Sequence, residues 1–292
     1  MELTEGFEHI VRKNEPLAGL TRLRLGGVAE YFAEPTNVDE LVGLIKRFNE
    51  HELPIRMIGN GSNIVIRDEG VPGLVIHLSA PEFCKIEVNG NKISAGGGTQ
   101  LSHFVSTAVR EGLSGPENFA GLPGTVGGAL HSNADANGVS IGTWVQSAMV
   151  VTRTGEVLAR SRNEMNFAYR QSSLSELAIV SAEFEFEQES ADELTKRLQK
   201  LWIVQRANQP SYAENAAYIF KDHGGESASK LIEQAGLKGT RVGDVEISER
   251  DANYFVAGPN ATCDEVVRLV ELVRSQVNER LEIDLQPGIT IW

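Results

Sequence analysis

The sequence predicts an α+β fold, because segments with helical periodicity and short strand-like runs both occur along the chain. Apolar residues recur at helical spacing in 41–48, as they do on the buried face of an amphipathic helix. Residues 180–186 instead alternate, with an apolar side chain at every second position, which is typical of a half-buried strand. The polar, charged stretch at 187–193 indicates a boundary. We therefore expect an N-terminal portion that ends near residue 188 and a C-terminal α/β domain.

Two helices are expected in the N-terminal portion, at residues 36–54 and 99–112. Thr36 or Asn37 can cap the start of the first helix, and Gly112 can end the second. The other segments of this portion are β-rich: IRMIG (55–59), IVIRD (64–68), GLVIHL (73–78), SAMVVT (147–152) and LAIVSAEFEFE (177–187). KIEVNGNKISA (85–95) is expected to form a hairpin with Asn89-Gly90 at its turn.

Helical patterns dominate the C-terminal part. LTKRLQKLWIVQR (194–206) reads as one helix, and SKLIEQAGLKG (229–239) contains a shorter one with core-like leucine and isoleucine residues. A continuous apolar stripe predicts a long helix near the end, and its members are Val266, Leu269, Val270, Val273, Val277 and Leu281.

Composition narrows the classes of function. A chain of 292 residues suits two or three compact domains, and a net charge of −13 argues against a protein that coats nucleic acid. The two cysteines imply no disulfide framework, and the six histidines show no spacing typical of a metal site. The first residues lack the apolar run of a signal peptide, and no stretch approaches the roughly 20 apolar residues of a membrane helix. We expect a cytoplasmic protein without a metal, a membrane or a nucleic-acid partner.

Two glycine-rich stretches are the first candidates for a ligand site. GNGSN (59–63) follows a predicted strand and can expose a row of backbone N–H groups to phosphate oxygens, although a plain tight turn is the commoner origin of such a loop. GLPGTVGG (121–128) lies about sixty residues further on, and its alternative is a buried loop packed against a helix. Neither stretch is a Walker loop or a strand–GxGxxG–helix motif. Together they indicate a long diphosphate ligand. Arg170 adds a forked donor for a carboxylate or phosphate, or else is a surface group.

These segments together resemble the UDP-N-acetylenolpyruvoylglucosamine reductases, the MurB family, in its shorter variety. LTRLRLGGVAEYF (20–32) is similar to the opening of that family, and IGNGSN (58–63) to its G-G-G-S-N loop. GLPGTVGGALHSNADANG (121–138) resembles G-I-P-G-T-V-G-G-A followed by N-A-G-A-x-G, and YRQS (169–172) resembles Y-R-x-S. SASKLIEQAGLKGTRVGDVEISERDANYFV (227–256) is similar to the family's A-G-x-L-I-E-x-A-G-L-K-G, then V-S, then H-x-N-F. The resemblance runs in order from about residue 15 to 292.

The resemblance implies a flavoprotein with a two-subdomain FAD-binding fold of the vanillyl-alcohol-oxidase (PCMH) type and a C-terminal substrate-binding domain. The expected parts are FAD-binding subdomain 1 (1–80), FAD-binding subdomain 2 (81–188) and the substrate domain (189–292). The expected FAD-binding residues are Gly59, Asn60, Gly61, Ser62, Asn63, Gly121, Pro123, Gly124, Thr125, Gly127, Gly128 and Asn133. Those expected to bind the nucleotide-sugar substrate are Tyr169, Lys221, Asp222 and Asn253. A monomer is expected.

The family's reaction, as the resemblance implies it, uses NADPH to reduce FAD and then delivers hydride to the enolpyruvyl double bond of UDP-N-acetylglucosamine enolpyruvate. The product, UDP-N-acetylmuramate, is a precursor of peptidoglycan, so cell wall biogenesis, cell shape and cell division depend on it. The family's catalytic groups are an arginine, a serine that donates a proton, and a late glutamate. Arg170 matches the arginine.

The other two catalytic positions depart from the family pattern. AAYIFKDH aligns with A-G-S-x-F-K-N-P, which puts Tyr218 at the serine, and QPGIT puts Gly288 at the glutamate of P-E-V. Asp251 also replaces the histidine of H-x-N-F. Tyr218 can itself be the proton donor, and Glu282 or Asp284, from the same segment as Gly288, can approach in place of the missing glutamate. Two alternatives stay open: an FAD-binding homologue with a different or lost redox reaction, and a nucleotide-sugar-binding or partner-binding protein without flavin.

Overall fold

The computed structural model describes residues 3–210 and 215–292, and their contacts divide the chain into two compact units. Unit 1 consists of Met1–Glu15, Glu30–Asn60 and Pro72–Arg206, and unit 2 of Pro16–Ala29, Gly61–Val71 and Ala207–Trp292. Two segments from the N-terminal quarter of the chain therefore belong with its last third. The three-part division expected from the resemblance, with boundaries after residues 80 and 188, stays a prediction about the limits of the subdomains.

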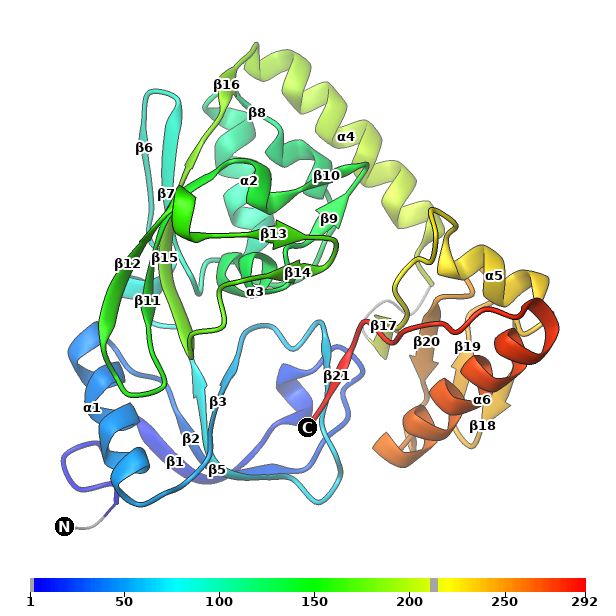
Figure 1. The fold of residues 1–292 in the computed structure, drawn as a ribbon, viewed down its shortest axis with the longest axis horizontal. Helices are drawn as coiled ribbons and strands as arrows, with labels where there is room; N and C mark the ends of the chain where they lie inside the picture. The colour runs from blue at the N-terminus through cyan, green and yellow to red at the C-terminus, as the bar shows by residue number, and fades with distance from the viewer. Residues whose placement is uncertain (1–2, 211–214) are drawn as a thin grey trace. The chain divides into compact units, whose positions relative to one another are not determined.

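The first sheet of unit 1 has the strand order β1-β2-β5-β3, with β1 at Val11–Pro16, β2 at Val28–Ala33, β5 at Val71–His77 and β3 at Ile55–Ile58 (Figure 1). β3 and β5 are parallel, and Ile55 pairs with Leu74. Helix α1 (Val38–Glu50) confirms the predicted first helix, and the side chain of Asn37 caps it by accepting from the N–H of Glu40. Its buried side chains are the four at helical spacing in 41–48, so this face supplies the core of the sheet.

The second sheet of unit 1 is antiparallel throughout. Its order is β12-β11-β15-β7-β6, from β12 (Val157–Ser161), β11 (Val145–Val151), β15 (Ala178–Glu185), β7 (Lys92–Gly96) and β6 (Ile86–Asn89). The predicted hairpin is confirmed as β6–β7, but its turn is one residue later than expected. Asn89 pairs with Lys92, so Gly90, with φ +63°, and Asn91 form the loop.

Helices α2 (Leu101–Arg110), α3 (Val126–His131) and α4 (Ala191–Asn208) complete unit 1, and α3 lies against β7 and β15 (Figure 1). Three two-stranded pairs join them: β9 (Asp135–Ala136) with β10 (Val139–Ser140), β13 (Phe167–Ala168) with β14 (Gln171–Ser172), and β8 (Leu113–Ser114) with β16 (Glu187–Gln188). Among the described residues, 3-10 turns lie at Ala18–Leu20, Pro81–Cys84, Pro116–Phe119, Ile141–Thr143 and Arg162–Glu164.

Ion pairs explain why α4 belongs largely to unit 1, although the charged stretch before it indicates a boundary. The guanidinium of Arg197 on α4 pairs with the carboxylate of Glu117 at 2.7 Å and also with Glu189. Glu117 is buried and also accepts the N–H of Gly115 at 2.6 Å. A buried carboxylate that loses its partner is costly, so this pair holds α4 in place.

Unit 2 contains a four-stranded antiparallel sheet in the order β17-β20-β19-β18, from β17 (Ala216–Tyr218), β20 (Tyr254–Ala257), β19 (Val245–Ile247) and β18 (Arg241–Val242). Helix α6 (Cys263–Leu281) packs on β18, β19 and α5 (Ala228–Gln234). Thr262 and Glu265 form a capping box that starts α6, and the predicted apolar stripe faces the core.

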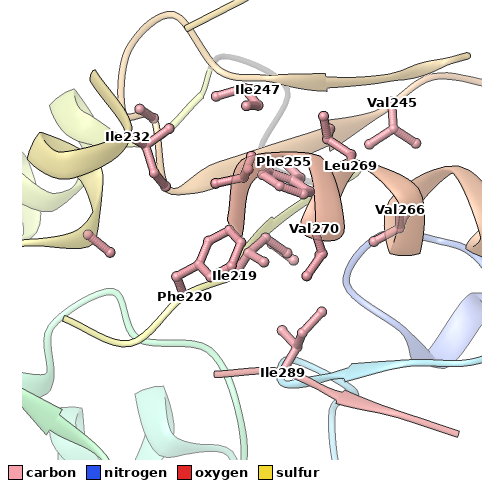
Figure 2. Close-up of a cluster of buried hydrophobic side chains, with 14 of the residues drawn as sticks. Ile219, Phe220, Ile232, Val245, Ile247, Phe255, Val266, Leu269, Val270 and Ile289 are labelled. Carbon is pink, nitrogen blue, oxygen red and sulfur yellow. The ribbon is translucent and has the colours of Figure 1, made fainter. Parts of the chain in front are cut away.

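The core of unit 2 draws on segments that are far apart in the sequence. Figure 2 shows Phe220 and Ile219 among side chains of β19, β20 and α6, with Ile289 from the last segment of the chain nearby. Leu23, Leu25 and Val65 from the N-terminal part of unit 2 belong to the same buried cluster. β21 (Thr290–Ile291) pairs in parallel with β4 (Ile64–Val65), so the predicted strand at 64–68 is shorter than expected.

Candidate functional site

The two predicted glycine-rich stretches meet inside unit 1. A Cβ atom added at Gly59 would lie 2.8 Å from Oγ1 of Thr125, closer than real Cβ contacts come. Gly59 directly follows β3, and Thr125 is the N-cap of α3. Glycine at 59 therefore allows the end of a strand to touch the start of a helix about sixty residues later in the sequence.

The continuation of the first loop lies in unit 2 and offers free backbone donors. Gly61 has φ +53°, and a Cβ there would come within 2.0 Å of the carbonyl oxygen of Leu20. Among the described residues, none accepts a hydrogen bond from the N–H groups of Gly61, Ser62 or Asn63. Three consecutive unpaired amides suit an anionic oxygen such as that of a diphosphate. This part of the predicted cofactor site fits its ligand.

Two backbone amides of the second glycine-rich stretch are hydrogen-bonded within the protein. The N–H of Gly127 donates to the carbonyl of Gly97 at 2.8 Å, and that of Gly128 donates to Oγ1 of Thr125 at 3.2 Å. Both amides are engaged within the protein, and their approach to the FAD diphosphate stays a prediction. A Cβ at Gly128 would have one near neighbour outside its own helix, Oγ1 of Thr125 at 3.3 Å. Gly121 and Gly124, at φ +74° and φ +127°, hold conformations that favour glycine.

A third glycine-rich stretch, Gly96 to Gly98, escaped the sequence reasoning. A Cβ at any of the three would fall 1.8–2.0 Å from a backbone oxygen, which is that of Phe83, Ile179 or Leu78. The N–H of Gly97 donates to the carbonyl of Val180 at 2.7 Å, and the carbonyl of Gly97 accepts a hydrogen bond from the N–H of Gly127. This stretch is the backbone surface on which residues 126–127 rest. Three successive glycines directly after a predicted strand are the sequence feature that could have indicated this close backbone packing.

Asn133 connects the end of α3 to the segment that carries Arg170. Its side chain is buried, donates from Nδ2 to the carbonyl of Ala168 at 2.7 Å, and accepts at Oδ1 from the N–H of Gly142 at 3.1 Å. These bonds use the acceptor and one donor of the amide within the protein. Asn133 thus supports two loops, and its predicted contact with FAD stays a prediction.

Tyr169 and Arg170 form the two-residue turn of the β13–β14 hairpin, where Ala168 pairs with Gln171. Arg170 has φ +52°, an uncommon conformation for a residue with a side chain. The Nε of Arg170 pairs with the Oδ1 of Asp135, and the Tyr169 side chain is half exposed. The turn presents these two predicted functional side chains together.

In unit 2, the phenol of Tyr218 contacts the carboxylate of Asp222 and the ring of Tyr254. Its hydroxyl donates to Oδ1 of Asp222 at 3.4 Å, and its ring meets that of Tyr254 edge to face at 5.4 Å between centroids. The same Oδ1 accepts the N–H of Ala228 at 2.9 Å. Burial and the nearby Asp251 carboxylate raise the pKa of Tyr254, so that tyrosine stays protonated.

Asn253, a predicted substrate residue, has a structural role that the sequence did not indicate. Its fully buried amide accepts the N–H of Phe220 and donates to the carbonyl of Phe220, both at 2.8 Å. The amide thus pairs with the backbone immediately before Lys221, as a neighbouring strand would. A direct contact of Asn253 with substrate stays a prediction.

Position 288, where the family resemblance places a glutamate, has room for a side chain. A Cβ at Gly288 would lie 3.4 Å from the carbonyl oxygen of Ile219 and 3.5 Å from Cγ of Lys221, which are ordinary contacts or nearly so. Asp284, one candidate substitute, pairs with Arg274 at 2.8 Å, and Glu282 is the C-cap of α6 at φ +57°. Asp284 is therefore already engaged in an ion pair.

Within residues 3–210 and 215–292, no group of three or more His, Cys, Asp and Glu side chains is arranged to hold a metal ion. No helix of these residues is both long and apolar enough to cross a membrane.

Comparison with known proteins identifies the family. Residues 209–292 match the family described as UDP-N-acetylenolpyruvoylglucosamine reductase, C-terminal domain, and residues 29–160 match an FAD binding domain. A UDP-N-acetylenolpyruvoylglucosamine reductase of Rhodopirellula baltica is 40% identical over 294 residues, which cover 99% of this chain and 96% of the relative. The chain belongs to the UDP-N-acetylenolpyruvoylglucosamine reductase family.

Other members support the assignment. A protein of Symbiobacterium thermophilum named UDP-N-acetylenolpyruvoylglucosamine reductase 2 is 39% identical over 97% of this chain and 92% of its own length. The crystal structure of the reductase from Thermus caldophilus has a TM-score of 0.83 and 32% identity, covering 97% of this chain and 99% of that one. The pollen protein Phl p 4, a glucose dehydrogenase, shares the fold alone, with a TM-score of 0.51 and 13% identity. The predicted family and fold class are confirmed, and FAD is the cofactor of this reductase family member.

Proposed function

We propose that this protein reduces the enolpyruvyl double bond of UDP-N-acetylglucosamine enolpyruvate to give UDP-N-acetylmuramate for peptidoglycan synthesis, with NADPH as the reductant. The observation that supports this most strongly is the family match over nearly the whole chain, joined to an FAD-binding domain at residues 29–160. The chemistry that bound FAD supplies is hydride transfer from NADPH to that double bond.

The protein's own residues then have three tasks: to bind the diphosphate, to stabilise negative charge and to deliver a proton. The free amides of Gly61, Ser62 and Asn63 are proposed to bind oxygens of the FAD diphosphate. Arg170 is proposed to stabilise the charge that develops beside the substrate carboxylate, because a guanidinium donates two parallel hydrogen bonds. Lys221 is proposed to bind an anionic group of the nucleotide sugar, and Tyr169 to line the substrate site.

Tyr218 is proposed to be the proton donor in place of serine. Its O–H bond breaks as the substrate carbon next to the carboxylate gains a C–H bond, and the tyrosinate regains a proton from solvent. The 3.4 Å hydrogen bond to Asp222 holds the phenol oxygen before reaction, and the O–H proton leaves this bond when it is transferred to the substrate carbon. Asp222 is itself held by the N–H of Ala228 at 2.9 Å. Hydroxyl acids of this kind contribute about a hundredfold or more to rate.

The decisive experiment is an anaerobic stopped-flow measurement on the FAD-loaded protein. The flavin is first reduced with NADPH and then mixed with UDP-N-acetylglucosamine enolpyruvate, while the absorbance of oxidised flavin is followed. Reoxidation at a rate that depends on substrate concentration is expected. A flavin that NADPH reduces but substrate does not reoxidise would contradict the proposal and favour the alternative of another electron acceptor.

The same experiment tests the proton donor. Tyr218→Phe is expected to leave reduction by NADPH unchanged and to slow reoxidation about a hundredfold or more, because only the second half-reaction needs the proton. Tyr254→Phe is the matched control, since it removes a hydroxyl from the ring beside Tyr218. If Tyr254→Phe stalls reoxidation and Tyr218→Phe does not, the proton donor has been assigned to the wrong tyrosine.

We further propose that the reductase is a cytoplasmic monomer that prefers NADPH to NADH. Sedimentation velocity of the FAD-loaded protein tests the first point. The ratio of flavin reduction rates with the two nucleotides tests the preference.

A further inference from the structure

Asp135 is the polar partner of Arg170, and nothing in the sequence marked it as functional. Its Oδ1 pairs with Nε of Arg170, and both atoms are almost completely shielded from solvent. Within the described part of the chain, neither atom makes a hydrogen bond, so the contact between them is an ion pair. The pair is thus a one-to-one contact between a carboxylate and one edge of the guanidinium.

Both members of the pair are held by short hairpins. Asp135 is in β9, which pairs with β10 so that Asp135 is opposite Ser140. Asn137 and Gly138, both at positive φ, form the tight loop between these strands. The backbone around Asp135 is therefore fixed by a turn that Asn-Gly favours.

The hairpin that carries Arg170 is anchored at several points. The carbonyl of Ala168 receives Nδ2 of Asn133 at 2.7 Å, and Oγ of Ser172 donates to the carbonyl of His131 at 2.9 Å. His131 in turn bonds the carbonyl of Leu174 at 3.0 Å. The chain atoms on either side of the Tyr169–Arg170 turn thus have fixed positions relative to α3.

The pairing leaves the other edge of the guanidinium available. An arginine side chain carries five N–H groups, and Nε supplies only one of them. No described residue accepts a hydrogen bond from Nη1 or Nη2 of Arg170, and the side chain is 33% exposed. Two parallel donors on one edge match the two oxygens of a carboxylate.

We propose that Asp135 is a positioning residue for the reductase reaction: by holding Nε, it orients Arg170 so that the Nη edge receives the carboxylate of the substrate. This inference rests on the proposed function, in which Arg170 acts on the enolpyruvyl group. Without Asp135 the long arginine side chain would sample several rotamers, and each substrate molecule would have to order it first.

The proposed role of Asp135 predicts different effects on two ligands that differ in whether they carry a carboxylate. UDP-N-acetylmuramate carries a carboxylate, whereas UDP-N-acetylglucosamine lacks it but shares the nucleotide and the sugar. An oriented Arg170 favours the first ligand only. Loss of Asp135 should therefore reduce the preference for the carboxylate-bearing ligand and leave binding of the other unchanged.

The test compares Asp135→Ala, Asp135→Asn and Asp135→Glu by calorimetric titration with both ligands and by the two flavin half-reactions. Asp135→Ala is expected to lower the preference for UDP-N-acetylmuramate and the reoxidation rate about ten- to a hundredfold, with reduction by NADPH unchanged. Asp135→Asn keeps an oxygen at the same distance along the side chain, beside Nε, and should restore most of the ligand preference and of the reoxidation rate. Asp135→Glu keeps the charge but lengthens the side chain, and should resemble Asp135→Ala.

Glu176→Ala is the matched control, because Oε1 of Glu176 accepts from Nε of Arg160 at 2.7 Å in another part of unit 1. It should leave ligand preference and both half-reactions unchanged.

Two results for Asp135→Ala would overturn the proposal. Equal losses for both ligands and both half-reactions would indicate a structural role, and wild-type behaviour would indicate no role. An Asp135→Asn variant as impaired as Asp135→Ala would show that charge, not orientation, is what matters. If Asp135→Ala does not fold, the contrast between Asp135→Asn and Asp135→Glu decides.

Failure of this inference is distinct from failure of the proposed function. A wild-type protein that shows no preference for UDP-N-acetylmuramate and no substrate-dependent reoxidation overturns the reductase itself. The positioning role alone is overturned if the wild-type protein and the Asp135 variants all prefer UDP-N-acetylmuramate and all show substrate-dependent reoxidation.

Discussion

The stretch Gly96 to Gly98 of unit 1 and position 288 of unit 2 are constrained in different ways. At Gly96 to Gly98 an added Cβ would collide with backbone oxygens at 1.8–2.0 Å, whereas at Gly288 it would meet its neighbours at 3.4 Å or more. In the first region the identity of the residue is imposed by the backbone itself. In the second the backbone does not require glycine. Two motif glycines, Gly59 and Gly127, are likewise kept where an added Cβ would come within 3.0 Å of a neighbour, whereas the family pattern departs at positions 218 and 288.

The largest effect is expected from placing a methyl group in the constrained region. Gly97→Ala puts Cβ 1.8 Å from the carbonyl oxygen of Ile179, and backbone on both sides must shift. We expect the free energy of unfolding to fall by about 3 kcal/mol or more, measured by urea denaturation.

Gly128→Ala is the matched control for this prediction. It makes the same substitution where only Oγ1 of Thr125 is near, and in a helix the alanine is favoured by up to about 1 kcal/mol. Equal stability of the two variants would show that the close backbone contact at Gly97 relaxes easily, and the comparison between the two regions would then fail.

The unconstrained region should accept the family's glutamate. Gly288→Glu introduces a side chain beside Lys221 without positive φ or a backbone collision, so the free energy of unfolding should change by about 1 kcal/mol or less. We expect reoxidation of reduced flavin by substrate to become about tenfold faster, because a carboxylate is restored to the position that carries it in the family pattern.

Gly288→Gln serves as the neutral control for the glutamate. A similar gain in both variants would show that the added side chain acts by filling space. A stable Gly288→Glu variant with slower reoxidation would show that the site around Tyr218 and Asp222 has adapted to the absence of the glutamate, and that position 288 is constrained after all.

The sequence predicted the elements better than it predicted the use of their polar groups. Helices α1, α2 and α6 followed from the spacing of apolar residues, because burial of one face determines that spacing. Asn133 and Asn253 were predicted to contact ligands, yet both amides are bonded to backbone within the protein. A sequence does not show which donors and acceptors the fold itself will use.

Asp135 illustrates the opposite failure. An aspartate two residues before Asn137-Gly138 suggests only a polar turn, because turns commonly contain such residues. Asp135 and Arg170 are 35 residues apart in the sequence, and their contact forms only because the two hairpins that carry them lie side by side. Pairwise contacts of this kind follow from tertiary packing and leave no local pattern in the sequence.

The smallest predicted effect concerns acid stability, which should depend on carboxylates of unit 1. Glu34, just after β2, accepts hydrogen bonds from Ser79 at 2.7 Å, Arg12 at 2.9 Å and His77 at 3.1 Å. Partial burial by itself raises the pKa of Glu34, but the hydrogen bonds from Ser79, Arg12 and His77 outweigh it, and the net pKa is lowered. The folded state therefore binds its proton less readily than the unfolded chain does.

The sign of the pH effect follows from that shift. A depressed pKa contributes stability above the unfolded value near 4.5, and this contribution is lost as the pH falls toward the folded value. Because Glu34 is partly exposed, we expect the effect to stay below about 1 kcal/mol. Glu34→Gln should flatten the fall in unfolding free energy below pH ~4.5, while Glu87→Gln, at an exposed position of β6, should keep the wild-type slope. If both variants keep that slope, the acid sensitivity of unit 1 comes from other carboxylates with lowered pKa, such as Glu40 or Glu189, which hydrogen bonds also stabilise in the charged form.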